Sequence, residues 1–150
     1  KYMWFVIISY SITLVVYAVY PTSQLLRPEV TEEGFLFDVI RWLYGYDTNT
    51  NVCPSLHVIG SLAVMFAAIK SEIIKSVPIK VVYVIAAVLI CVSTVFIKQH
   101  SVIDLYWGIV VSVVAYPLVF MENFISSKLV KMFDINAKTG KELTDEIIIN

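Results

Sequence analysis

Charged side chains are scarce in this chain of 150 residues, because Asp, Glu, Lys and Arg together make up only 15% of it. Hydrophobic residues account for 59%, and the mean hydropathy of +0.80 lies far outside the range of an ordinary soluble domain. The net charge of -1 argues against a nucleic acid as partner, since that requires a basic face. The only two cysteines, Cys53 and Cys91, predict no disulfide framework and are expected to be inert. The composition therefore indicates an integral membrane protein.

Four apolar stretches approach the roughly 20 residues needed to cross a bilayer. They cover residues 2–20, 55–69, 77–97 and 102–121. The second stretch is short, so its first turn is expected to face protein or water. We therefore predict an all-α, polytopic transmembrane helical bundle with four spans in a domain at 1–125, followed by a polar cytoplasmic tail at 126–150.

The loop at 21–54 is too long for an ordinary connection between two spans. Within it, the segment FLFDVIRWLYG (35–45) carries apolar residues at helical spacing and polar residues on the other faces. This pattern predicts a short helix lying in the membrane interface. Its role is either that of a structural lid or that of a gate through which lipid reaches a site.

The distribution of lysine predicts the orientation of the spans. Each span reverses the chain, so the loops at 21–54 and 98–101 share one side and the other connections share the opposite side. Lysines gather on that opposite side, at Lys1, Lys70, Lys75, Lys80, Lys128 and Lys131. The positive-inside rule makes the lysine-rich side cytoplasmic. The loop at 21–54 is then extracytoplasmic, and the plasma membrane is the expected location.

Both histidines of the chain lie near the ends of spans on the predicted outer side. His57 belongs to CPSLH (53–57) and His100 to STVFIKQHSVID (93–104), while Arg27, Ser55 and Asp104 fall at the same depth. A single histidine at a span end is more often a hydrogen-bonded or interfacial residue, and Arg27 alone could anchor a lipid headgroup. Polar groups at membrane depth are costly and usually functional, so the joint pattern predicts a site.

The residue types in this pattern suit phosphate chemistry. Pro54 is expected in the first turn of the second span, whose free N–H groups, together with Ser55 and the fork of Arg27, would bind phosphate oxygens. His100 and Asp104 share a helix face at four-residue spacing, so the carboxylate can orient the imidazole as a nucleophile. His57 would act as general acid.

Two further possibilities concern charge and metal binding. Lys98 lies two residues before His100, so it either binds the same phosphate or merely extends to the membrane surface. A metal site made of His57, His100 and Asp104 is conceivable. However, no H-E-x-x-H motif or paired-cysteine spacing supports it, so we expect neither a metal nor another cofactor.

Three blocks of the sequence carry a resemblance to a known family. RP (27–28), PSLH (54–57) and STVFIKQHSVID (93–104) resemble the signature blocks of the phosphatidic acid phosphatase type 2 superfamily, K-x6-R-P, P-S-G-H and S-R-x5-H-x3-D. The resemblance implies a six-helix membrane fold, with two helices before Lys1. It also implies that Arg27 and Ser55 bind phosphate, that His100 forms a phosphohistidine with Asp104 as its partner, and that His57 is the general acid.

The departures from this pattern are as informative as the matches. Tyr20 stands where the first block has lysine, Leu56 where the second has glycine, and Thr94 where the third has arginine. This variant resembles the branch that contains inositol phosphorylceramide synthases. The resemblance thus implies a metal-independent phosphatase acting on a lipid phosphate monoester or pyrophosphate. One alternative is a phosphotransferase that passes a phospho-headgroup to an alcohol. Another is a non-catalytic lipid-binding protein.

Overall fold

The computed structural model describes residues 1–121, which fold into five helices and, within that range, no strand. The helices are α1 (Tyr2–Val19), α2 (Phe35–Tyr46), α3 (Leu56–Lys70), α4 (Val77–Phe96) and α5 (Val102–Phe120). The all-α prediction is confirmed, and the four apolar helices begin and end close to their predicted bounds. The predicted domain boundary after residue 125 and the tail at 126–150 lie outside the described residues.

Only three of the four predicted spans are long and apolar enough to cross a membrane by themselves. These are α1, α4 and α5, whereas α3 has 15 residues and is shorter than a full crossing requires. The structure therefore indicates a helical membrane protein. The four-span count and the six-helix fold remain predictions.

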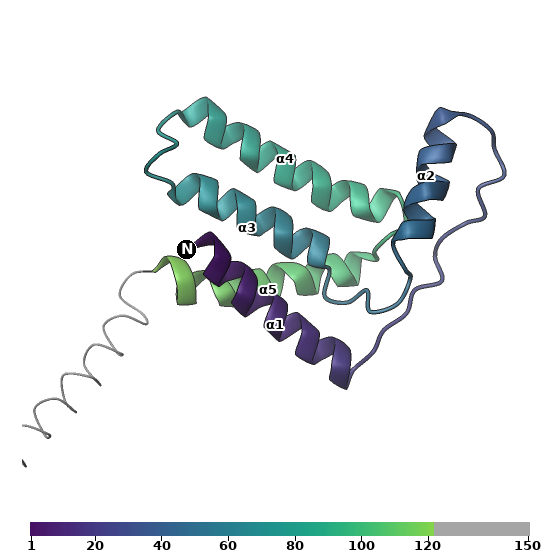
Figure 1. The fold of residues 1–150 in the computed structure, drawn as a ribbon, viewed down its shortest axis with the longest axis horizontal. Helices are drawn as coiled ribbons and strands as arrows, with labels where there is room; N and C mark the ends of the chain where they lie inside the picture. The colour runs from purple at the N-terminus through teal and green to yellow at the C-terminus, as the bar shows by residue number, and fades with distance from the viewer. Residues whose placement is uncertain (122–150) are drawn as a thin grey trace, which may run out of the picture.

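Helix α3 lies at the centre of the arrangement, because it packs against α1, α4 and α5, whereas α4 packs chiefly on α3. Successive apolar helices run in opposite directions (Figure 1). The N-terminus, the connection at 71–76 and the end of α5 gather at one end of the bundle, which we call the lysine end. The segments at 20–55 and 97–101 gather at the other end, as the alternation of spans predicts.

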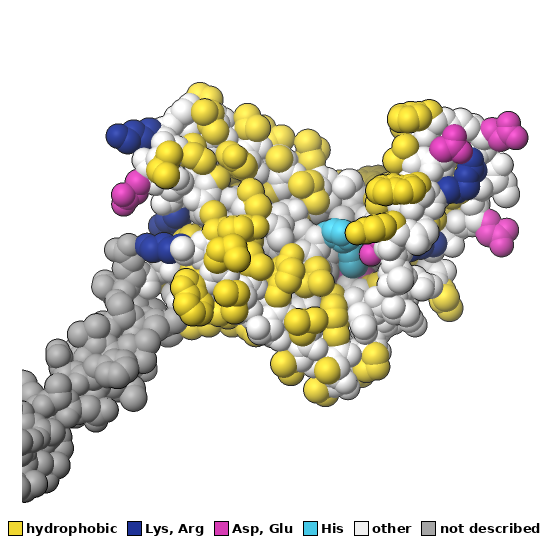
Figure 2. Space-filling view, in the orientation of Figure 1, with side chains coloured by type: hydrophobic (Ala, Val, Ile, Leu, Met, Phe, Trp, Pro, Cys, Tyr) yellow, Lys and Arg dark blue, Asp and Glu magenta, His cyan; other side chains and the backbone are white. Residues whose placement is uncertain are grey.

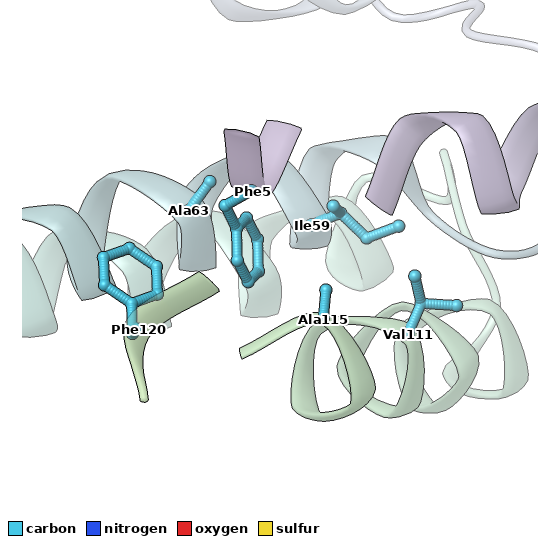
Figure 3. Close-up of a cluster of buried hydrophobic side chains, with 6 residues drawn as sticks. All are labelled: Phe5, Ile59, Ala63, Val111, Ala115 and Phe120. Atoms are coloured by element: carbon cyan, nitrogen blue, oxygen red, sulfur yellow. The ribbon is translucent and has the colours of Figure 1, made fainter. Parts of the chain in front are cut away.

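The buried apolar cluster sits toward the lysine end and is built on aromatic rings. The ring of Phe5 from α1 lies 5.9 Å from that of Phe120 in α5 and 5.7 Å from that of Phe66 in α3, measured between centroids. Figure 3 shows Phe5 between side chains of α3 and α5, with Ile59 and Val111 farther along the same interface. These contacts fix the three helices together at the end remote from both histidines.

Small polar residues allow the helices to approach closely inside the bundle. Ser9, Thr13 and Ser112 are fully buried, and each hydroxyl donates to the carbonyl four residues earlier in its own helix. This arrangement satisfies the hydroxyls without a partner from another helix. Serine and threonine are typical of contacts between membrane helices for this reason.

Helix α2 stands apart from the bundle. It lies across the end opposite the lysine end (Figure 1), packs on none of the other helices, and has no buried residue. A hydrogen bond connects α2 to the bundle: the Tyr44 hydroxyl donates to the carbonyl of Ile97 at 2.7 Å. The predicted helix is confirmed, while its place in the membrane interface and its role as lid or gate remain predictions.

Candidate functional site

The two histidines of the chain lie side by side, although they are 43 positions apart in the sequence. Their ring centroids are 5.4 Å apart and the ring planes are inclined by 68°. Helix α3 is five residues shorter than α4, 15 against 20, or about 7 Å at 1.5 Å per residue. His57, in the first turn of α3, is therefore recessed, and Figure 2 shows histidine in a hollow between the bundle and α2.

A tight turn at the end of α4 places His100 in this hollow. The backbone N–H of Lys98 donates to the carbonyl of Val95 at 3.1 Å, and that of Gln99 donates to Thr94 at 3.0 Å. These two bonds form a Schellman motif, which normally has glycine where Lys98 stands with a φ of 56°. The N–H of His100 also donates to the Thr94 carbonyl, so the same turn fixes the nucleophile candidate.

Asp104 begins helix α5 together with Ser101 in a capping box. Its Oδ2 accepts from the Ser101 backbone N–H at 2.7 Å, and Ser101 Oγ accepts from the Asp104 N–H at 3.3 Å. The same Oδ2 lies 3.7 Å from Nδ1 of His100, which is close but longer than a hydrogen bond. Nδ1 has no other partner within residues 1–121. Catalytic hydrogen bonds often shorten only when substrate binds, so this geometry suits an orienting carboxylate.

The surroundings of His100 favour its neutral form. Burial lowers the pKa of its imidazole most, and the neighbouring charge of His57 lowers it further. The carboxylates of Asp104 and Asp47 and the carbonyl of Val52 act in the opposite direction without reversing the shift. The imidazole is therefore unprotonated at neutral pH, which is the state that a nucleophile requires.

Ser55 is the N-cap of α3 and is fully buried. Its Oγ accepts from the N–H of Val58 at 3.4 Å, and its own N–H donates to the carbonyl of Asp104 at 3.1 Å. The start of α3 is thereby fixed against the start of α5. The prediction that Pro54 lies in the first helical turn is wrong. Ser55 is the N-cap, so Pro54 lies outside the helix, one residue before the cap. Ser55 as a phosphate ligand remains a prediction.

Arg27 is engaged with the segment that follows α2. Its guanidinium donates to the carbonyls of Tyr44, Asp47 and Thr48, forms a 3.0 Å ion pair with the Asp47 carboxylate, and lies 5.0 Å from the Tyr44 ring centroid. The Nε–H is buried without a partner in the described part of the chain. Phosphate binding by Arg27 remains a prediction, and a phosphate there would have to compete with Asp47.

The positions at which the resembling family has further cations supply none in this chain. Tyr20 is exposed at the end of α1, and Thr94 is only 3% exposed, with its hydroxyl donating to the Cys91 carbonyl at 2.8 Å. Lys98 is exposed in the turn before His100, and its side chain is the predicted substitute. Its left-handed backbone is unusual for a residue with a Cβ and is often found at functional positions.

Sequence reasoning missed three residues of this region. Asp47 pairs with Arg27, and its charge reaches His100. Cys53 is near Asp104: burial, and then that carboxylate, raise the pKa of the Cys53 thiol to about 11, which suits the expected inertness. Gly108 lets α5 approach α3, because a Cβ there would lie 3.0 Å from Cβ of Val58. The only sequence signal for Gly108 is its four-residue spacing from Asp104.

Comparison with known proteins adds no relative. No family model matches the chain, and no curated protein or solved structure is significantly similar to it. The three sequence blocks and the geometry of the histidine pair are therefore the basis for proposing a function.

Proposed function

We propose that this protein is an integral membrane lipid phosphatase that acts through a phosphohistidine intermediate. The observation that supports this most is the juxtaposition of His57 and His100 at 5.4 Å, with the Asp104 carboxylate 3.7 Å from the inner nitrogen of His100. A neutral, buried histidine beside a carboxylate is suited to nucleophilic attack. A second, exposed histidine beside it is suited to proton transfer.

The proposed reaction has two steps. The outward nitrogen of His100 attacks the phosphorus, a P–N bond forms, and the bond between phosphorus and the lipid oxygen breaks as that oxygen takes a proton from His57. Water then attacks the phosphohistidine, His57 accepts a proton from the water, and phosphate leaves as the P–N bond breaks. Asp104 stabilises the positive charge on the His100 ring in the intermediate. The scheme requires no metal and no cofactor.

Phosphate binding in this proposal combines a helix end with side chains. The first N–H groups of α3 and its positive dipole end lie beside His57. Arg27, Ser55 and Lys98 are the proposed side-chain ligands. Because Arg27 already binds Asp47, the charge available to phosphate is smaller than in the resembling superfamily.

The proposed family is the phosphatidic acid phosphatase type 2 superfamily, in the variant branch with inositol phosphorylceramide synthases. In that branch an alcohol can replace water in the second step, so lipid phosphotransfer is the alternative reaction. The engagement of Arg27 by Asp47 favours a third candidate, a non-catalytic lipid-binding membrane protein. We favour the phosphatase because His57, His100 and Asp104 are all brought together.

One experiment separates these candidates. The purified full-length protein is incubated with a panel of lipid phosphate monoesters and pyrophosphates, with and without lipid alcohols, and both phosphate and lipid products are measured. The phosphatase releases free phosphate, the phosphotransferase makes a new phospholipid, and the lipid-binding protein does neither. Inhibition by a chelator that a divalent metal reverses would contradict the metal-independent reaction.

The proposed location of the site is the extracytoplasmic face of the plasma membrane. Lys1, Lys70, Lys75 and Lys80 belong to the end remote from the histidines, and Lys128 and Lys131 lie outside the described residues. In a variant with Cys53 replaced by Ser, Thr48→Cys is expected to react with an impermeant thiol reagent in intact cells. Glu72→Cys, at the lysine end, is expected not to react. The reverse labelling would place the site in the cytoplasm.

A further inference from the structure

A cavity of about 820 Å³ lies between α1 and α5, and neither histidine lines it. Its walls include Ile12 and Val16 of α1 and Trp107, Val110 and Val114 of α5. Ligand pockets in proteins are usually about 300–1,000 Å³, so this volume suits a ligand of substantial size. We call it the α1–α5 cavity.

The cavity follows from the way the two helices meet. Aromatic packing holds α1 to α5 near Phe5 and Phe120, and the helices diverge toward the other end (Figure 1). Leu25 and Val114 line the cavity and are also largely exposed, so its interior is reachable from the surroundings. Both helices are apolar enough to cross a membrane, which makes those surroundings lipid chains. Lipid chains fill an apolar space more favourably than water does.

One part of the wall is polar and is connected by hydrogen bonds. The Thr22 hydroxyl accepts from the N–H of Cys53 at 3.1 Å, and the Asp104 carboxylate accepts from the backbone N–H of Ser101 at 2.7 Å. All four residues line the cavity. We call this place the polar end, and the sides of α1 and α5 that form the rest of the wall are apolar.

Gln24 lies beside the polar end and is fixed there by its backbone. Its N–H donates to the Asn49 carbonyl, and its carbonyl accepts from the Asn49 side chain. Gln24 lines the cavity and is only 6% exposed, and its amide Oε1 and Nε2 are buried without a hydrogen-bond partner among residues 1–121. Because both amide atoms are closed off from the open space, the choice of ligand rests on the charges that line the cavity.

The charges at the cavity select among lipids. No Lys or Arg is among the residues that line it, whereas the carboxylate of Asp104 is. An anionic headgroup at the polar end would meet a like charge in an apolar setting without a counter-ion, which is unfavourable. A hydroxyl group can instead donate to that carboxylate.

We propose that the α1–α5 cavity is a binding site for an uncharged lipid alcohol, of the diacylglycerol or ceramide type, with its hydroxyl at Asp104. The same carboxylate lies 3.7 Å from His100, so occupancy of the cavity alters the environment of the nucleophile candidate. This coupling rests on the proposed function, whereas the binding itself does not. A lipid alcohol is also the class of molecule that a lipid phosphatase releases or that a phosphotransferase accepts.

The test compares two photoreactive lipids with the same acyl chains, diacylglycerol and phosphatidic acid, with the full-length protein in nanodiscs. Crosslinks are mapped by mass spectrometry. We expect diacylglycerol to label Trp107 and Val110 at least about fivefold more than phosphatidic acid does. Val110→Trp, which fills the cavity, should lower this labelling about fivefold, while Val113→Trp, on an exposed face of the same helix, should leave it unchanged. Val114→Phe is a milder second variant, and gel filtration checks that each variant folds.

Two further variants separate the two proposals. Asp104→Asn, which can still accept the capping bond, should reduce the preference for diacylglycerol over phosphatidic acid. His100→Ala should keep the labelling in full, so loss of phosphatase activity does not by itself remove the binding site. Equal labelling by both lipids, or labelling spread equally over the exposed Leu89 of α4, would overturn the proposal. Stronger labelling by phosphatidic acid would overturn the charge argument and with it the choice of ligand.

Discussion

The hollow with the histidines and the α1–α5 cavity lie at the same end of the molecule but have opposite character. The hollow is formed by the ends of helices and connecting turns, and it contains His57, His100 and the pair of Arg27 with Asp47 nearby. The cavity is formed by the sides of two apolar helices. The comparison shows that a single carboxylate, that of Asp104, belongs to both regions, because it lies 3.7 Å from His100 and also lines the apolar cavity.

This difference arises from where the helices are held together. Aromatic rings fix α1, α3 and α5 toward the lysine end, and the close contact at Gly108 fixes α3 to α5 beside the hollow. Ile12 still packs on the buried cluster and Thr13 is fully buried, whereas the last turn of α1 is tied by the Tyr17 hydroxyl, which donates to the Pro54 carbonyl at 2.6 Å. Contacts between α3 and α5 therefore hold the hollow in place, while the cavity lies where α1 and α5 pack incompletely.

Replacing the nucleophile candidate is expected to have the largest effect and to act on the hollow alone. His100→Ala should lower kcat/KM for a lipid phosphate by at least about a thousand-fold, because the covalent step loses its nucleophile. A phosphohistidine is labile in acid and stable in alkali, so the radiolabelled phosphoenzyme that an alkaline quench traps in the wild type should also be absent. Near wild-type turnover in this variant would refute the phosphohistidine mechanism.

Lys98→Met is expected to have the next largest effect, again confined to the hollow. If Lys98 binds phosphate, loss of its charge with retention of its stem should lower kcat/KM by about ten- to a thousand-fold. Lys75→Met, at the lysine end, is the matched control and should leave kcat/KM within a few-fold of wild type. The same small change in Lys98→Met would show that Lys98 only extends to the membrane surface.

Gly108→Ala should weaken the packing of α5 against α3, which lies between the two regions. A Cβ at this position meets Cβ of Val58 at 3.0 Å and the carbonyl of Ser55 at 3.1 Å. Overpacking costs about 1–3 kcal/mol, which outweighs the gain of up to about 1 kcal/mol in helix propensity. We expect a lower free energy of unfolding in detergent and a loss of activity through the displaced turn of α3.

Gly45→Ala in α2 is the matched control for this substitution. A Cβ at Gly45 meets no atom within 4 Å, so only the gain in helix propensity remains. Its effect on stability should be neutral or favourable, and activity should be unchanged. Equal behaviour of the two variants would show that the contact at Gly108 does not frame the site.

The smallest expected effect is a change in the pH response of His100. The charge of His57 is one cause of its lowered pKa, so His57→Gln should raise the pKa of His100 toward the ordinary value of 6.5. A folded-state pKa below the unfolded one means that stability is present above about pH 6.5 and is lost as the pH falls below it. His57→Gln should reduce this loss. NMR titration of labelled histidine measures the first effect, and unfolding at pH 5 and 7 measures the second.

Much of the fold was predictable because local patterns determine it. The apolar runs and the helical spacing at 35–45 led to the five helices, and the alternation of spans placed both histidines at one end. His100 and Asp104 do lie close together, at 3.7 Å, but the predicted shared helix face is wrong, because His100 lies in the turn before the Ser101 N-cap of α5. Pro54 does not lie in the first turn of α3 as predicted, because Ser55 is the N-cap. The bond from the Ser55 N–H to the Asp104 carbonyl joins segments far apart in the sequence, so no local pattern predicts it.

The sequence by itself determined that this is an apolar helical protein with its few polar residues collected near span ends, because composition and periodicity are local properties of the chain. Only the tertiary structure decided that His57 faces His100, that Arg27 binds Asp47, and that α1 and α5 diverge around a cavity. These features depend on distances between segments far apart in the sequence. Such distances are set by side-chain packing at a few contacts, such as those of Phe5 and Gly108, which no periodic pattern records.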